Sequence, residues 1–329
     1  MTDLAPILQG FFTDRLARQK RASSNTITSY RDTFRLLLTF ARERTGKEPS
    51  RLSLGDLDAT LVGAFLQHLE DERKNGSATR NARLAAIHSL FSYAASRAPE
   101  HALVVSQVLA IPPRRRERAI VSYLTPEEVD AIVAGPDRKT WHGRRDQALL
   151  LFAIQTGLRV SELTAVACQD VHLGAGPHVR CHGKGRKERA TPLTSQVVST
   201  LRTWLIELGR GPDHPLFPTQ AGGRLSRDAV GQLVAKHAST AADGCPSIKA
   251  KNVTPHTLRH TAAMSLLRAG VDTSVIALWL GHEDVETTQI YLHADMTIKE
   301  RALARVQQPG TTPGRYRPPD TLLAFLDNL

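Results

Sequence analysis

Four short segments in the second half of the chain gather residues that could bind and attack a phosphate. They are TGLRVSEL at 156–163, GKGRKER at 183–189, HTLRH at 256–260 and LGHEDVETTQIY at 280–291. Attack on a phosphodiester by a side-chain oxygen places extra negative charge on the phosphate oxygens, and the planar guanidinium of arginine meets such oxygens in pairs. Arginine, lysine, histidine and tyrosine are therefore residue types suited to phosphoryl transfer.

In this order, the four segments resemble the catalytic domain of the tyrosine recombinases, the family of phage integrases and Xer proteins. The resemblance covers residues 120–300 closely and the N-terminal third more loosely, as a helical core-binding domain. It implies a catalytic hexad of Arg159, Lys184, His256, Arg259, His282 and Tyr291. It also implies DNA cleavage and rejoining through a 3′ phosphotyrosyl intermediate, without ATP, metal or another cofactor. Synapsis in this family joins four protomers on two DNA sites.

Tyr291 is the nucleophile that the resemblance implies, with Arg159 and Arg259 flanking the phosphorus. A free phenol has a pKa of about 10, so only about one in a thousand is ionised at pH 7, a cost of roughly 4 kcal/mol that nearby cations and a proton acceptor must reduce. The only other tyrosine after His282 is Tyr316, in the loop-like segment GTTPGRYRPPD, where no predicted helix holds it. Tyr291 is therefore the better candidate.

Other members of the site have supporting roles. Lys184 lies in a glycine-flanked turn, from which a long cationic side chain can protonate the departing 5′ oxygen. His256 is three residues before Arg259 on a predicted helix and shares its face, whereas His260 is expected on a different face as an ordinary structural histidine. The resemblance implies that His282 hydrogen-bonds the scissile phosphate.

Glu162 follows Arg159 by one helical turn. A carboxylate in this position is predicted to hold the catalytic side chains through hydrogen bonds without reacting itself.

A further group of residues is predicted to contact DNA. Lysine and arginine outnumber aspartate and glutamate by 43 to 32, a formal net charge of +11, which favours a polyanion as partner, although basic charge can also serve solubility alone. The candidates are Thr79, Arg80 and Arg83 off the apolar stripe of a helix, Arg114, Arg115 and Arg116 in the basic segment PPRRRERAI, and Arg186, Lys187 and Arg189 beside Lys184. The last two groups are either phosphate contacts or solvated charges.

The N-terminal third is predicted to be helical, with about four helices separated by breaks at 45–50 and 71–77. One helix covers 25–41, where apolar residues recur at helical spacing and Ser24 is a suitable N-cap. Another begins after Gly76.

The second half is predicted to be mostly helical with a small sheet. Its expected elements are a helix capped by Thr125 with Pro126 at its first position, a buried helix over 146–156 stopped by Gly157, two strands within 179–193, a helix over 226–238 and a helix from Pro255. These elements would position all four segments.

The fold class is thus mainly α with a small antiparallel sheet, forming a C-shaped clamp around DNA. The expected parts are a helical core DNA-binding domain over 1–111, a basic linker over 112–121, a catalytic domain over 122–305 and a tail over 306–329 with a short helix. The tail's apolar residues, Leu322, Leu323, Phe325, Leu326 and Leu329, must dock, either in cis or on a neighbouring protomer.

Several other classes are disfavoured. The longest wholly apolar run, Ala148–Ile154, has seven residues, against the roughly 20 that span a bilayer, and a cytoplasmic protein is expected. Zinc is disfavoured because Cys168, His172, His178, Cys181 and His182 lack close CxxC pairs. The rival functions are a catalytically silent, sequence-specific DNA-binding accessory protein and a type IB topoisomerase.

Overall fold

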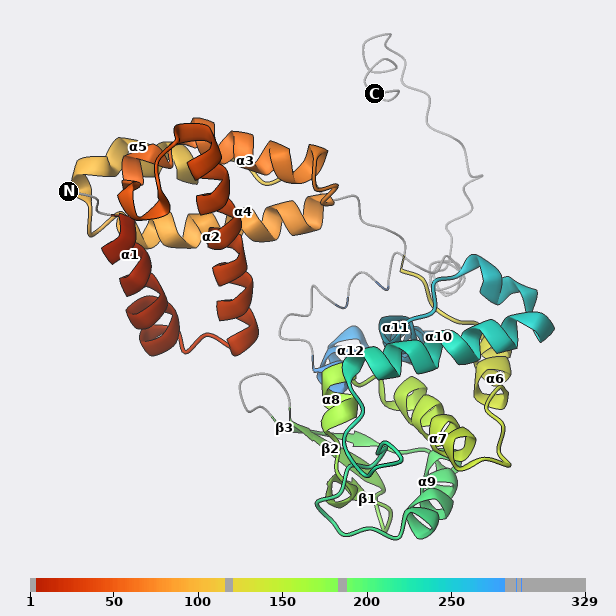
Figure 1. Cartoon of the computed structure of the whole chain (residues 1–329). Helices are drawn as coiled ribbons and strands as arrows, with labels where there is room; N and C mark the ends of the chain where they lie inside the picture. Colours follow the sequence, from red (N-terminus) through yellow and green to blue (C-terminus); the bar gives the residue numbers. More distant parts are fainter. Residues whose placement is uncertain (1–3, 116–120, 183–187, 282–287, 289–290, 292–329) are drawn as a thin grey trace, which may run out of the picture. The chain divides into compact units, whose positions relative to one another are not determined.

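The computed structural model describes residues 4–115, 121–182, 188–281, 288 and 291. The chain divides into two compact units, Met1–Arg118 and Ala119–Leu329 (Figure 1). The described residues are mostly helical and include a small antiparallel sheet, which confirms the prediction of a mainly α fold with a small antiparallel sheet.

The N-terminal unit consists of helices around an aromatic core. Its elements are α1 (Leu4–Gly10), a π-helical segment (Phe11–Gln19), α2 (Ser24–Thr45), α3 (Ala59–Asp71), α4 (Ser77–Ala94), α5 (Ala102–Leu109) and short 3-10 turns at Pro49–Arg51, Leu54–Asp56 and Pro99–His101. Phe11 is fully buried, and its ring centroid lies 5.7–6.2 Å from those of Tyr30, Phe34 and Tyr93. Burying one such ring contributes about 1.5–3 kcal/mol.

The predicted helices at 25–41 and after Gly76 are confirmed as α2 and α4, with two differences. The N-cap of α2 is Ser23 rather than Ser24, because the Ser23 hydroxyl accepts the backbone N–H of Thr26. The unit also has more helices than the predicted four, because helical structure extends over residues 4–19.

The second unit packs helices against a three-stranded sheet. Its elements are α6 (Pro126–Ala134), α7 (Trp141–Thr156), α8 (Val160–Ala165), β1 (Val171–His172), β2 (His178–His182), β3 (Glu188–Pro192), α9 (Ser195–Leu208), α10 (Arg227–Gly244), α11 (Pro255–Arg268), α12 (Thr273–Leu280) and 3-10 turns at Cys168–Asp170 and Pro246–Ala250. Strand β2 lies between β1 and β3, and Val179 pairs with both Val171 and Thr191. The two-residue strand β1 was not predicted, because so short a strand has no periodic pattern.

Capping residues and a glycine fix the ends of the helices around the candidate site. Thr125 caps α6, as predicted, and forms a capping box with Glu128, while Thr254 caps α11. Gly157 ends α7 with a φ of 64°. A Cβ there would lie 2.6 Å from Leu280 Cδ2, so only glycine fits both the left-handed backbone and the close approach of α12.

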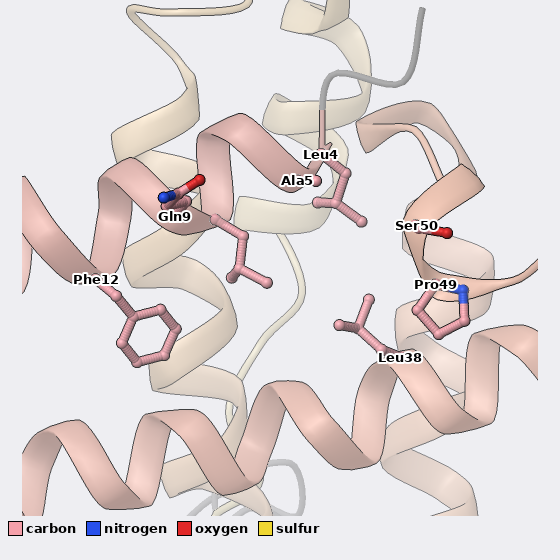
Figure 2. Close-up of a pocket in the computed structure, with 8 residues that line it drawn as sticks. Leu4, Ala5, Gln9, Phe12, Leu38, Pro49 and Ser50 are labelled. Atoms are coloured by element: carbon pink, nitrogen blue, oxygen red, sulfur yellow. The ribbon is translucent and has the colours of Figure 1, made fainter.

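An apolar groove lies on the N-terminal unit, with a volume of about 400 Å³ (Figure 2). Its lining residues are Leu4, Ala5, Leu8, Gln9, Phe12, Leu38, Pro49 and Ser50. None of these side chains carries a charge that could hold a phosphate. Among the described residues, no helix is long and apolar enough to cross a membrane.

Candidate active site

Arg159 is held at the start of α8, two residues after Gly157. Its backbone N–H donates to Glu162 Oε2 at 2.8 Å, and its guanidinium donates to Glu162 Oε1 at 3.2 Å and to the carbonyl of Gly281 at 2.9 Å. The side chain is nevertheless 39% exposed. The guanidinium is therefore fixed in direction while part of it faces solvent, where it can meet an anion.

Glu162 is buried between two arginines. Arg189 of β3 donates to both carboxylate oxygens, at 3.0 and 2.7 Å, and also to the carbonyl of Trp279 at 3.1 Å. Burial alone would raise the pKa of Glu162, but the hydrogen bonds from Arg189 and Arg159, together with their charges, lower it overall. Glu162 thus remains ionised and ties α8, β3 and α12 together.

Replacing Glu162 with glutamine should destabilise the second unit, because it leaves the guanidinium of Arg189, 13% exposed, without its counter-ion. Breaking a buried pair in this way costs about 3 kcal/mol, which corresponds to a fall in Tm of about 6 to 12 °C. Calorimetry at pH 7 measures this fall in Tm. The control is Glu207→Gln, which breaks an exposed pair with Arg144 and should change Tm little.

The loss of stability in Glu162→Gln should depend on pH in a defined direction. Because the folded pKa of Glu162 is lowered, its stabilisation is present above the ordinary value of 4.5 and is lost as pH falls through the folded pKa. The Tm difference between wild type and Glu162→Gln should therefore shrink on acidification below pH 4.5. A difference that stays constant to the acid limit would contradict the ion-pair account.

Arg259 lies on α11 and is only 3% exposed. It donates to the carbonyl of Gly157 at 2.7 Å and to that of Leu280 at 2.9 Å, so it joins α11 to the ends of α7 and α12. Burial, and then the charge of Arg159, lower its pKa to about 10, which leaves it charged at neutral pH. The guanidinium charges of Arg159 and Arg259 thus repel each other in a partly desolvated site. A bound anion would reduce this repulsion.

His256 and His260 form a stacked pair on α11. Their ring centroids lie 5.2 Å apart at an interplanar angle of 3°. The prediction that His260 points to a different face was wrong, because residues four apart on a helix lie one turn above each other. Desolvation and the charges of Arg259 and Arg159 lower the pKa of His256, which therefore lies within the field of both arginines.

Tyr291 is 1% exposed and packs with α11 and α12 through Ala263, Met264 and Leu280. Its Oη lies 2.9 Å from His260 Nδ1, and the two rings meet edge to face at 5.6 Å. Burial raises the pKa of the phenol, and the charges of Arg259 and Arg159 oppose that rise. The structure therefore brings together four members of the predicted hexad: Arg159, His256, Arg259 and Tyr291.

Sequence reasoning missed His260 as a neighbour of the tyrosine hydroxyl. The signal was present in HTLRH, where the two histidines are four residues apart. The other two hexad members, Lys184 and His282, lie outside the described residues, as do Arg116, Arg186 and Lys187.

The predicted DNA contacts of the N-terminal unit differ in exposure. Thr79 is exposed on α4, whereas Arg80 is 7% exposed and donates to the carbonyl of Pro112 at 3.4 Å. Arg83 donates to the Ser29 carbonyl and to Thr33 Oγ1. The guanidinium groups of Arg80 and Arg83 are thus already engaged within this unit.

The start of the basic segment is attached to α4. The Asn81 side chain accepts the backbone N–H of Arg114 at 2.9 Å and donates to the Arg114 carbonyl at 2.8 Å. The side chains of Arg114 and Arg115 are exposed. Both therefore project from a backbone that is fixed at Arg114, rather than from a connector that is free throughout.

Comparisons with known proteins agree with this arrangement. The sequence matches the Phage integrase family over residues 122–297 and the Phage integrase N-terminal SAM-like domain over residues 10–98. A putative integrase/recombinase, y4rC, of Sinorhizobium fredii is 53% identical over 326 residues, covering 99% of this chain and 98% of that protein. Tyrosine recombinase XerC of Pelobacter propionicus is 31% identical over 304 residues, covering 89% of this chain and 94% of that protein.

Solved structures share the fold. The XerH site-specific recombinase bound to difH substrate, in a pre-cleavage complex, matches with a TM-score of 0.65 at 22% identity, over 87% of this chain and 81% of that one. The Tn1549 transposon integrase in complex with a circular intermediate DNA matches with a TM-score of 0.67 at 14% identity, over 91% of this chain and 99% of that one. With its matched domains and full-length relatives, this chain belongs to the phage integrase family of tyrosine recombinases.

Proposed function

We propose that Tyr291 is the nucleophile with which this recombinase cuts and rejoins DNA at a specific site. The observation that carries the assignment is the placement of the Tyr291 phenol within the field of Arg159 and Arg259, in the same cluster as His256. Two cations beside a phenol favour its ionised form and can also hold the oxygens of the phosphate that it attacks.

The proposed reaction has two transfers. Tyr291 Oη attacks phosphorus to give a 3′ phosphotyrosyl bond, and the 5′ oxygen leaves with a proton from Lys184. A 5′ hydroxyl of the partner strand then attacks the phosphotyrosyl bond and restores the phosphodiester. Because each bond is exchanged for an equivalent one, no ATP is required. Arg159 and Arg259 stabilise the charge on the phosphate oxygens, and His282 adds a hydrogen bond to them.

The experiment that tests the function is the capture of covalent complexes on DNA. The purified chain is incubated with DNA from its source, denatured in detergent and recovered by the protein, and the attached DNA is sequenced. A single recurring sequence at the attachment point supports a site-specific recombinase. Attachment at random sequences, with relaxation of plasmids that lack any such site, indicates a topoisomerase. DNA binding without covalent attachment indicates an accessory protein.

Binding to DNA is proposed to rest mainly on phosphate contacts, including those of Arg114 and Arg115, which are exposed, and of Arg116. Affinity should then fall by about 10³-fold or more between 50 and 200 mM salt. Replacing Arg114, Arg115 and Arg116 together with alanine should weaken binding to all sequences alike and reduce the salt slope by about one for each lost phosphate contact. Filter binding across a salt series measures both. A triple variant with the parent's affinity and slope would contradict this role.

We also propose that synapsis joins four protomers on two DNA sites and that the protein acts in the cytoplasm. The tail, residues 306–329, lies outside the described residues and is proposed to dock on a neighbouring protomer. Removing residues 321–329 should therefore impair synapsis more than binding to a single site. Gel-shift assays with one-site and two-site DNA separate the two effects, and equal losses in both would favour docking in cis.

A further inference from the structure

His260, which stacks on His256, lies beside the hydroxyl of Tyr291. We propose that His260 Nδ1 accepts the proton of the Tyr291 phenol as Oη attacks phosphorus. This inference rests on the proposed function and adds a catalytic group to the hexad.

The geometry supplies the first argument. Nδ1 of His260 lies 2.9 Å from Oη of Tyr291, within the range in which a base removes a proton directly. The phenol is 1% exposed, so bulk water has little access to its proton, and the acceptor must be a nearby group. The ring of His256, stacked in parallel on His260, restricts the orientation of the base.

The protonation states supply the second argument. Burial, followed by the charges of His256 and Arg259, lowers the pKa of His260 to about 4, so its ring is neutral at pH 7 and has a lone pair available. Burial raises the pKa of Tyr291, so the phenol carries a proton to donate. The two side chains whose charges lower the pKa of His260, His256 and Arg259, both lie on α11 itself, and α7, α10 and α12 pack on this helix.

Binding of the DNA substrate should change the pKa of His260. The scissile phosphate brings one negative charge into the site and gains more in the transition state. Nearby negative charge favours the imidazolium form, so the pKa of His260 should rise when DNA is bound. In this way the residue would be a weak base in the free protein and a stronger one in the complex, which couples deprotonation of Tyr291 to the presence of DNA.

The proton balance closes over both transfers. In cleavage, the bond from Oη to phosphorus forms and the bond from phosphorus to the 5′ oxygen breaks. The phenol proton goes to His260, and Lys184 gives a proton to the 5′ oxygen. In rejoining, the attacking 5′ hydroxyl returns its proton to Lys184, and the His260 imidazolium returns its proton to Oη. No external acid or base is consumed.

The test uses His260→Asn, His260→Ala and a control, His142→Asn, at an exposed position on α7. Asparagine offers an amide oxygen near the place of Nδ1 and keeps a hydrogen-bond acceptor, but it cannot take a proton. Single-turnover cleavage is measured on a 5′ phosphorothiolate substrate, whose leaving group needs no proton. Gel shift and Tm report binding and folding for each protein.

Both His260 variants should cleave at least about 100-fold more slowly than wild type at pH 7 while still binding DNA, as expected for loss of a general base. Added imidazole should restore part of the rate to His260→Ala. The wild-type rate should level off above the pKa of the base in the complex. The rate of His260→Asn should instead keep rising about tenfold per pH unit toward the pKa of the phenol. The control should match wild type.

Other results would overturn the inference. A His260→Asn protein that cleaves at the wild-type rate would show that a hydrogen bond suffices. An equal loss at every pH without imidazole rescue would show that the ring only positions Tyr291. If both variants fold poorly, the wild-type protein still provides a test. A wild-type cleavage rate that continues to rise tenfold per pH unit at pH 9 would reject His260 as the general base. Should wild type form no adduct, the proposed function fails as well; an adduct on Tyr291 together with an unaffected His260→Asn rejects this inference alone.

Discussion

Tyr291→Phe should bind the DNA site as tightly as wild type and form no covalent adduct. The phenyl ring keeps the packing of Tyr291 against α11 and α12, and only the hydroxyl is lost. Loss of the hydrogen bond to His260 costs about 1 kcal/mol of stability, which leaves the protein folded. Gel shift measures binding, and denaturing gels of reactions on a nicked trapping substrate measure the adduct.

The matched control is Tyr123→Phe in the same unit. Tyr123 packs against the same apolar cluster as Tyr291, but its hydroxyl accepts a hydrogen bond from Arg268, at 3.0 Å. This variant should form the adduct at the wild-type rate. An adduct that persists in Tyr291→Phe, or one that disappears in Tyr123→Phe, would contradict the assignment of the nucleophile.

Arg159→Ala and Arg259→Ala should each abolish detectable cleavage, and they should differ in stability. Each removes charge stabilisation worth about 3 kcal/mol or more in the transition state, a loss of at least about 10²-fold in rate. Arg259 also supplies the donors for the carbonyls of Gly157 and Leu280, which its removal leaves unpaired in the interior. Arg159→Ala should therefore lower Tm less than Arg259→Ala.

Single-turnover cleavage and calorimetry on the same preparations separate the two effects. Arg202→Ala is the control, since Arg202 likewise donates to a backbone carbonyl, that of Leu173 at 2.7 Å, but lies on α9 outside the site. It should cleave normally. Normal cleavage by Arg159→Ala would refute its contact with the phosphate.

Local signals in the sequence predicted much of the framework. Thr125 and Pro126 at the start of α6, and Gly157 at the end of α7, act through hydrogen bonds and backbone angles within a few residues, so the sequence reveals them directly. The cap of α2 fell one residue away from the prediction because adjacent serines offer the same hydroxyl. The short strand β1 depends on pairing with β2, which no local pattern shows.

Contacts between distant segments could not be predicted in the same way. The pair of Arg189 and Glu162 joins β3 to α8 across 27 residues, and it engages an arginine that the sequence suggested for DNA. The contact of His260 with Tyr291 spans 31 residues and depends on the packing of Tyr291 against α11, which no local pattern shows. The helical spacing of His256 and His260 was visible in the sequence, but the contact of His260 with Tyr291 was not.

The most direct measurement of the central claim is mass spectrometry of the trapped adduct. The wild-type protein is reacted with a nicked substrate, the DNA is trimmed by nuclease, and the protein is digested to peptides. We predict a nucleotide attached through a 3′ phosphate to the Tyr291 hydroxyl, and no nucleotide in the same peptide from Tyr291→Phe. A nucleotide on Tyr316, or on any serine or other tyrosine, would contradict the account.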